Sequence, residues 1–187
     1  MKRKLITMAL LFGGIASMSQ AKDEKKFLDS YAGQSVDQLL AMKADFRVDS
    51  LVLAFEQAIQ QKKDKKKALS QVESDVLAVE AMEREVNNGG YHQFFLNSSG
   101  EYAATLPGAL ERIGCPVAAT MATDALGQLK INGEVTKRKI DAALERLGDR
   151  LATELGEIDA RYYENTEPIA DKLFEYIMAN QDKVSLK

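Results

Sequence analysis

Apolar residues recur at helical spacing along almost the whole chain, and this pattern constrains the fold more than any other feature. The clearest stretch is the stripe Val72, Val76, Val79, Met82 and Val86, in which spacings of three and four residues place the side chains on one helical face. The alternation of apolar and polar residues that half-buried strands need is hard to find. The sequence therefore predicts an all-α fold.

Capping signals and breaks divide this pattern into separate helices. Ser70 followed by Glu73 is a capping-box pattern, so a long amphipathic helix is expected to begin there and to end at Asn87-Asn88-Gly89-Gly90. The other expected helices are one from Ser35 to Met42, one capped by Asp49, 101–113, 117–131, 136–147 and a last one from near Thr166. The side chains expected to face the core from the helix at Asp49 and from the last helix are Leu51, Val52, Phe55, Ile59, Ile169, Leu173, Tyr176 and Ile177.

The N-terminus has the composition of a secretory signal peptide. Met1-Lys2-Arg3-Lys4 is positively charged, residues 5–18 form an apolar stretch of 14 residues, and Ser19-Gln20-Ala21 offers small residues at a cleavage site. A spanning helix needs about 20 residues, so the stretch is short for an anchor, and an uncleaved anchor is the alternative. We expect cleavage of residues 1–21, export to the periplasm or out of the cell, and no stable membrane insertion of the mature chain.

The mature chain has the length of one domain. Removing 21 residues leaves 166 and changes the formal net charge from −3 to −6. Residues 22–67 alone are too few to bury much of a core. We therefore expect a single compact domain, in which residues 22–67 form a helical and polar extension packed on a body made of residues 68–187.

Charge is unevenly distributed between these two parts. Residues 22–67 hold 10 basic and 8 acidic side chains, whereas residues 68–187 hold 12 basic and 20 acidic ones. An acidic body argues against direct nucleic-acid binding, which depends on neutralising phosphates with Lys and Arg. The basic run from Lys62 to Lys67 is expected to be a solvated loop or helix end, with contact to a nucleic acid or a membrane as the alternative.

The residues that commonly carry catalysis or bind metals are scarce. Cys115 is the only cysteine, so no intramolecular disulfide can form, and we expect a small buried hydrophobe rather than a nucleophile. His92 is the only histidine, so a zinc site would have to rely on carboxylates and Cys115. No HExxH, P-loop, GxSxG or paired CxxC motif is present. The sequence therefore predicts no metal, no cofactor and no enzymatic activity.

The run from Glu85 to Tyr102 departs furthest from generic helical sequence. Its distinctive residues are Glu85, Asn87, Asn88, Gly89, Gly90, Tyr91, His92, Gln93, Phe94, Phe95, Asn97, Ser98, Ser99, Gly100 and Tyr102. The two glycines accept positive φ at little cost, which suits a sharp reversal between helices. The rings at positions 91, 94, 95 and 102 are expected to lie in the core. The polar groups of Gln93, Asn97, Ser98 and Ser99 are expected to bond free backbone groups at a second break before Gly100.

A functional interpretation of the same run stays open beside this structural one. Its polar residues gather at two adjacent helix breaks, where they would line a pocket or a partner surface; they are Glu85, Asn87, Asn88, His92, Gln93 and Asn97. Glu85 near His92 would also resemble an acid–base pair. A small-molecule-binding or hydrolytic protein that uses this region is therefore the third functional hypothesis.

This run resembles the signature of the DNA-mimic protein family, small all-helical proteins of mostly unknown function, in the form E-V-N-N-G-G-[FY]-x-Q-F-F-x-N-x-S-G. The helix before it, the helix that ends in Ile113-Gly114, and the segment 158–163 before the last helix with Tyr176-Ile177 also look similar, so the resemblance covers roughly residues 70–180. In DNA-mimic members, surface carboxylates imitate duplex phosphates and occupy the DNA-binding surface of a transcription factor. The resemblance implies an all-helical fold and a protein partner.

The acidic residues near the C-terminus are the expected partner face under that resemblance. Glu167, Asp171 and Glu175 are spaced by four residues on the expected last helix, and Glu164 precedes it. Like charges at this spacing repel, so a solvated face and a binding face are both open. The first functional hypothesis is an exported, non-enzymatic protein-binding module, and the alternative is an acidic DNA mimic that binds a DNA-binding protein. The sequence predicts no oligomeric state.

Overall fold

The computed structural model describes residues 24–186, and within them the chain is helical and forms no strand. The elements in order are α1 (Val36–Ala41), η1 (Met42–Ala44), α2 (Val48–Asp64), α3 (Gln71–Leu96), η2 (Ser98–Tyr102), α4 (Leu106–Ile113), α5 (Pro116–Gln128), α6 (Lys137–Tyr163), α7 (Ile169–Ala179) and η3 (Gln181–Lys183), where η denotes a short 3₁₀ helix. The predicted all-α fold is confirmed. The predicted signal peptide, residues 1–21, lies outside the described residues.

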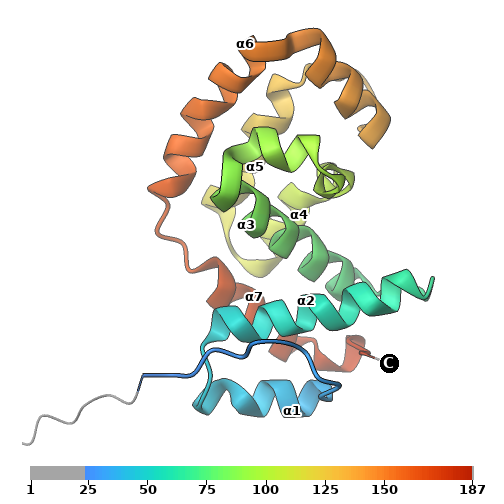
Figure 1. The fold of residues 1–187 in the computed structure, drawn as a ribbon, viewed down its shortest axis with the longest axis vertical. Coiled ribbons are helices and arrows are strands. Elements are labelled where there is room, and N and C mark those ends of the chain that lie inside the picture. The colour runs from blue at the N-terminus through green and yellow to red at the C-terminus, as the bar shows by residue number, and fades with distance from the viewer. Residues whose placement is uncertain (1–23, 187) are drawn as a thin grey trace, which may run out of the picture.

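Helix α3 occupies the middle of the molecule (Figure 1). It packs against α2, α4, α6 and α7, while α6 arches over α5 at one end and α1 lies beside α2 at the other. Each of the seven α-helices contributes to one continuous hydrophobic core. Residues from the N-terminal extension, including Leu39, Leu51 and Phe55, lie in the same core as Leu173 and Phe174 of α7.

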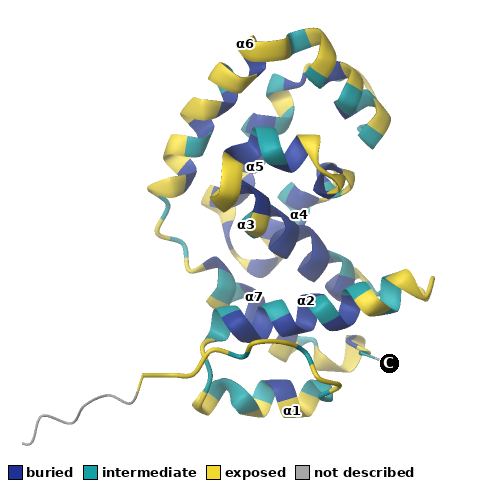
Figure 2. Ribbon diagram, viewed as in Figure 1, coloured by how far each residue is buried: buried dark blue, intermediate teal, exposed yellow. Residues whose placement is uncertain are grey.

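The predicted stripe on α3 is buried, but so is much of its polar face (Figure 2). The capping box is confirmed: the backbone N–H of Glu73 donates to Ser70 Oγ, and the N–H of Ser70 donates to Glu73 Oε2. Beyond the apolar stripe, the acidic side chains buried on this helix are Glu73, Asp75, Glu80 and Glu85. The expected amphipathic pattern was wrong for these residues, because neighbouring helices cover α3 on several sides.

The chain departs from helical geometry at Gly89 and Gly90, and the helix then resumes and continues to Leu96. The predicted break and helix end are therefore confirmed: a first helical part ends at these glycines, and a second part of α3 follows them. Gly90 has the expected positive φ of +73°, whereas the φ of −167° at Gly89 is extended backbone that any residue adopts. The backbone N–H of Tyr91 donates to Asp159 Oδ1 of α6 at 2.8 Å. This bond anchors the interruption to a neighbouring helix.

Other helix limits differ from the sequence expectation for local reasons. Ser35 caps α1 as predicted, but Arg47 precedes α2, and Asp49 lies in the first turn, where it pairs with Arg47. The helix expected to begin at residue 101 begins at Leu106, after η2.

The helix expected over residues 136–147 does end at Gly148, whose backbone angles are not helical. A second helical part, which was not predicted, follows Gly148 and extends to Tyr163, and both parts are labelled α6. The buried residues Leu151, Leu155, Ile158 and Tyr162, spaced by four, three and four, carry the sequence signal for this second half.

The lysine run forms the end of α2, which confirms the predicted helix end. Lys62 Nζ lies 2.7 Å from the fully buried carboxylate of Glu73, and Lys63 Nζ lies 2.9 Å from Glu101 Oε1. Lys65, Lys66 and Lys67 are exposed. The run therefore has a structural role in its first half and lies in solvent in its second half.

Replacing Gly90 should destabilise the fold more than replacing Gly89. A Cβ atom at Gly90 would lie 2.1 Å from Asp159 Oδ2, and its positive φ is unfavourable for an L-residue. We expect Gly90→Ala to lower the free energy of unfolding by about 1–3 kcal/mol. At Gly89 the Cβ would lie 2.2 Å from Gln93 Oε1 and 3.1 Å from Gln93 Cβ. The amide can turn away at the cost of its hydrogen bond to Glu85, so Gly89→Ala should cost about 1 kcal/mol. Urea unfolding of both variants measures the difference, and equal losses would contradict this account.

Candidate functional site

Glu85 is the centre of a hydrogen-bond cluster within the signature run. Its Oε2 accepts from Gln93 Nε2 at 2.9 Å and from Asn97 Nδ2 at 2.8 Å, and its Oε1 accepts from Ser99 Oγ at 3.0 Å. Burial alone would raise the pKa of the Glu85 carboxyl, but these hydrogen bonds hold the pKa below its usual value. The cluster connects the first part of α3, across the interruption, to η2.

This arrangement corrects the expectation that these amides and hydroxyls bond the backbone. The Gln93, Asn97 and Ser99 side chains donate to Glu85 instead, because a buried carboxylate needs donors more strongly than a helix end that solvent can reach. Ser98 is exposed. Gly100 is required by close packing, since a Cβ atom there would lie 2.7 Å from the carbonyl oxygen of Phe95.

The aromatic residues of the run lie in the core, as predicted for three of the four. Tyr91, Phe94 and Phe95 are buried, and the Tyr91 ring centroid lies 6.2 Å from that of Tyr162 on α6. Burial raises the pKa of the Tyr91 hydroxyl. Tyr102 is only half-buried, and its hydroxyl accepts a hydrogen bond from Lys63 Nζ at 2.7 Å.

The remaining polar residues of the run are dispersed. Asn87 and Asn88 are exposed, and Asn87 Nδ2 donates to the backbone oxygen of Glu83. His92 is half-buried and is not among the hydrogen-bond partners of Glu85. Burial raises the pKa of Asp159, and the Tyr91 N–H and the charge of His92 oppose that rise. The charge of His92 therefore acts on Asp159, and the predicted pairing of His92 with Glu85 is not formed.

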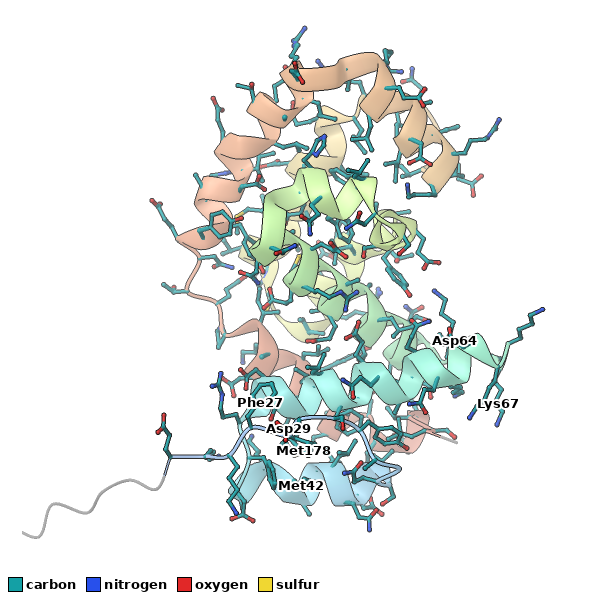
Figure 3. The ribbon with its side chains drawn as sticks, viewed as in Figure 1. Phe27, Asp29, Met42, Asp64, Lys67 and Met178 are labelled. Atoms are coloured by element: carbon teal, nitrogen blue, oxygen red, sulfur yellow. The ribbon has the colours of Figure 1, made fainter. Side chains whose placement is uncertain are left out.

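An open cavity of about 670 Å³ lies between α2, α3, η2 and the chain before α1. Its wall includes Glu56, Asp64, Arg84, Ser98, Ser99 and Glu101. Figure 3 shows Asp64 near the end of α2. Part of the signature run therefore reaches a cavity, but α2 supplies much of the wall. Sequence reasoning missed these α2 residues because nothing in the sequence brings residues 56–64 next to residues 98–102.

The acidic residues beside the cavity differ in their partners: Glu56 is paired with Arg84, whereas Glu80 is not paired within the described residues. Glu56 Oε1 accepts from Arg84 Nη1 at 2.5 Å, and Arg84 Nε lies 3.8 Å from Glu85 Oε1. Glu80 is also buried, and among residues 24–186 its carboxyl has no hydrogen bond to another side chain. Burial, together with the charge of Glu56, raises the pKa of Glu80 to about 8. Glu80 is therefore mostly protonated at neutral pH.

Glu167 does not belong to the predicted acidic partner face of the last helix. Both of its carboxylate oxygens accept backbone hydrogen bonds at the start of α5, from Val117 N at 2.9 Å and from Ala118 N at 2.8 Å. This cap holds Glu167 away from α7, which begins only at Ile169. The predicted three-carboxylate face was therefore wrong.

Two carboxylates of that face remain on α7. Asp171 and Glu175 are exposed one turn apart, and Glu164 is exposed before the helix. Lys172 Nζ lies 3.3 Å from Glu175 Oε2, which partly compensates its charge. The acidic excess of the sequence is also reduced at the surface: among residues 68–186, ten acidic and eight basic side chains are exposed.

Cys115 is fully buried, as predicted, and burial raises the pKa of its thiol to about 11. Among residues 24–186, no group of three His, Cys, Asp or Glu side chains is placed to bind a metal ion. None of the helices in the described part of the chain has the length and hydropathy needed to cross a bilayer.

These features define an all-α protein whose signature run joins its central helix to the surrounding elements. The family model for DMP19-like proteins matches residues 67–180, more than half of the chain, so the chain belongs to the DMP19-like protein family. The match begins before α3 and ends just after α7. It agrees with the family resemblance of the signature run. Comparison with curated proteins and comparison with solved structures gave no match.

Replacing Glu80 should stabilise the protein increasingly as pH rises. Its pKa is about 8 in the folded state and near 4.5 in an unperturbed chain, so folded Glu80 holds a proton that the unfolded chain releases between these values. Wild-type stability should therefore fall across this window, by up to about 1.4 kcal/mol per pH unit from this group.

Glu80→Gln removes this dependence, so its advantage over wild type should grow from pH 5 to pH 8. Urea unfolding at several pH values measures it, with Glu175→Gln as an exposed control that should follow wild type. Parallel pH curves for Glu80→Gln and wild type would show that Glu80 titrates normally.

Proposed function

We propose that this chain acts by binding another protein and does not catalyse a reaction. Membership of the DMP19-like family carries this proposal, because the name of that family refers to a DNA mimic protein. The exposed carboxylates of α7, Asp171 and Glu175, supply a surface to which a basic partner can bind. Half-buried Lys172 is their nearest compensating cation on the helix.

DNA mimicry toward a DNA-binding protein is the specific form of this function that family membership favours. A DNA-binding protein presents Lys and Arg side chains arranged to meet phosphates, and exposed carboxylates can meet the same side chains. Asp171 and Glu175 are one helical turn apart, so their charges lie on the same side of α7. The excess of acidic residues in 68–187 opposes direct binding to a nucleic acid.

The geometry of the signature run supports a non-enzymatic role. A general base needs a carboxylate free to take a proton, whereas the Glu85 carboxylate accepts three hydrogen bonds and its pKa is lowered. No hydrogen bond joins it to His92 in the described structure. The Cys115 thiol is buried with a raised pKa, which disfavours the reactive thiolate.

Neutralising the α7 carboxylates should weaken partner binding without unfolding the protein. We expect the double variant Asp171→Asn/Glu175→Gln to bind a partner captured from host extract roughly two- to thirtyfold more weakly, since exposed ion pairs contribute about 0.2–1 kcal/mol each. Binding should also weaken as salt rises. Affinity by surface plasmon resonance and melting temperature are the two measurements.

The matched control is Glu145→Gln/Asp149→Asn, which removes two exposed charges at the same sequence spacing from α6. The control should retain wild-type affinity. Unchanged affinity in the folded α7 variant, or equal losses in both variants, would remove this face from the proposal.

We further propose that the protein is exported and that its partner lies in the same compartment. The charged, apolar and small-residue segments of residues 1–21 stand in the order that export requires. N-terminal sequencing of the protein from fractionated host cells should give a chain beginning at Lys22 in the periplasmic or extracellular fraction. An intact Met1 in the cytosolic fraction would overturn the export proposal and would place the partner among cytosolic DNA-binding proteins.

A further inference from the structure

The dipeptide Asn-Gly occurs twice in this chain, at Asn88-Gly89 and at Asn132-Gly133, in two different backbone settings. Asparagine followed by glycine is chemically labile, because the backbone nitrogen of glycine attacks the asparagine side-chain amide without hindrance from a Cβ atom. The attack requires that the fold leaves this nitrogen free to reach the side chain. The backbone geometry at each copy therefore decides whether that copy reacts.

Asn88 is held in a geometry that prevents the attack. It has helical backbone angles, since the interruption of α3 comprises only Gly89 and Gly90. In a helix each backbone N–H points along the axis toward the carbonyl oxygen four residues earlier, so the nitrogen of Gly89 is directed away from the Asn88 side chain. This part of α3 must open before Asn88 reacts, even though its side chain is exposed.

Asn132 lies instead in the loop between α5 and α6, where neither it nor Gly133 belongs to a helix. Both residues are exposed, and Gly133 has a positive φ of +73°. Within residues 24–186, neither the Gly133 N–H nor the Asn132 side chain makes a hydrogen bond. Helical geometry therefore does not restrain the attacking nitrogen, and solvent water reaches both residues.

Lys139 polarises the peptide group that contains this nitrogen. Its ammonium group donates to the backbone carbonyl oxygen of Asn132 at 3.0 Å and to that of Glu134 at 2.8 Å. The Asn132 oxygen and the Gly133 N–H belong to the same peptide group, so the negative charge left when this N–H loses its proton is shared with that oxygen. A cation placed where charge develops lowers the barrier of a reaction.

We propose that Asn132 is a site of spontaneous deamidation, with the Gly133 nitrogen as nucleophile, Lys139 as the group that stabilises the developing charge, and water as the co-reactant. The Gly133 nitrogen releases its proton to solvent and forms a bond to Asn132 Cγ. The bond between Cγ and Nδ2 then breaks, Nδ2 takes up a proton and leaves as ammonia, and a cyclic imide remains. Water opens the imide at either of its two carbonyl carbons and gives aspartate or isoaspartate.

The modification changes the charge and the backbone of one loop. Either product adds one negative charge next to Glu134, which is already exposed. Isoaspartate also lengthens the main chain of the loop by one methylene group. The protein therefore acquires a second, more acidic form with time, and this form is independent of the proposed partner face on α7.

Incubation of the full chain in mildly alkaline buffer, followed by peptide mapping with mass spectrometry, tests the proposal. Cleavage after Lys and Arg places Asn132 in fragment 131–137 and Asn88 in fragment 85–112, so the two sites are measured separately. We expect Asn132 to be converted at least about tenfold faster than Asn88, because α3 must open before Asn88 reacts.

The unfolded chain is the control for the effect of the fold. In concentrated urea the two sites should react at similar rates, because each consists of the same dipeptide and neither is held by a helix. Conversion of Asn88 as fast as that of Asn132 in the folded chain would overturn the proposal. A tenfold difference that persists in urea would do the same, since it would not come from the structure.

Substitution of Lys139 tests its part in the reaction. Lys139→Met should slow the conversion of Asn132 about two- to tenfold, the effect of losing one charge-assisted hydrogen bond, whereas Lys139→Arg keeps a cationic donor and should retain most of the rate. The matched control Lys130→Met removes the same charge from an exposed position at the start of this loop and should react like wild type. Melting temperatures establish that the variants fold. An unchanged or faster rate in Lys139→Met, or equal slowing in Lys130→Met, would overturn the role of Lys139.

Discussion

Three of the four acidic residues buried on α3, Glu73, Asp75 and Glu85, accept hydrogen bonds, and most of the donors come from elements that surround the helix. Glu73 accepts hydrogen bonds from Lys62 Nζ of α2 and from the backbone N–H of Ser185 near the C-terminus. Asp75 accepts two hydrogen bonds from Arg112 of α4 and one from Tyr176 of α7. Since an unpaired buried charge is strongly destabilising, these bonds fix the positions of α2, α4 and α7 around α3.

The signature run extends the same principle to the second half of α3. Glu85 gathers Gln93, Asn97 and Ser99, while Asp159 of α6 receives the Tyr91 N–H next to the interruption at Gly90. One carboxylate therefore links α3 to η2, and another links it to α6. The carboxylate-bonded residues of the signature run thus join elements, while Asn87, Asn88 and Ser98 are exposed at the surface.

This internal use of acidic residues changes what the net charge implies about function. A chain with 20 acidic and 12 basic residues after position 67 suggests a strongly negative surface. In the structure, four of those acids are buried on α3, and Glu167 caps α5. Any imitation of phosphates must rely on a smaller set of exposed carboxylates, so the proposed partner face on α7 can be tested by few substitutions.

The sequence by itself determined the helical class, the capping box at Ser70, the break at Gly89-Gly90 and the buried stripe on α3, because helical periodicity, capping and glycine conformation are local properties. It did not determine the partners of the acidic side chains. Glu73, Asp75 and Glu85 occupy positions that an isolated amphipathic helix would expose to water, and only packing by neighbouring helices buries them. Likewise, the Glu167 side chain caps α5 and does not lie on α7, and Glu56 and Glu101 line the same cavity. These contacts join residues that are distant in sequence, so only the tertiary structure determines them.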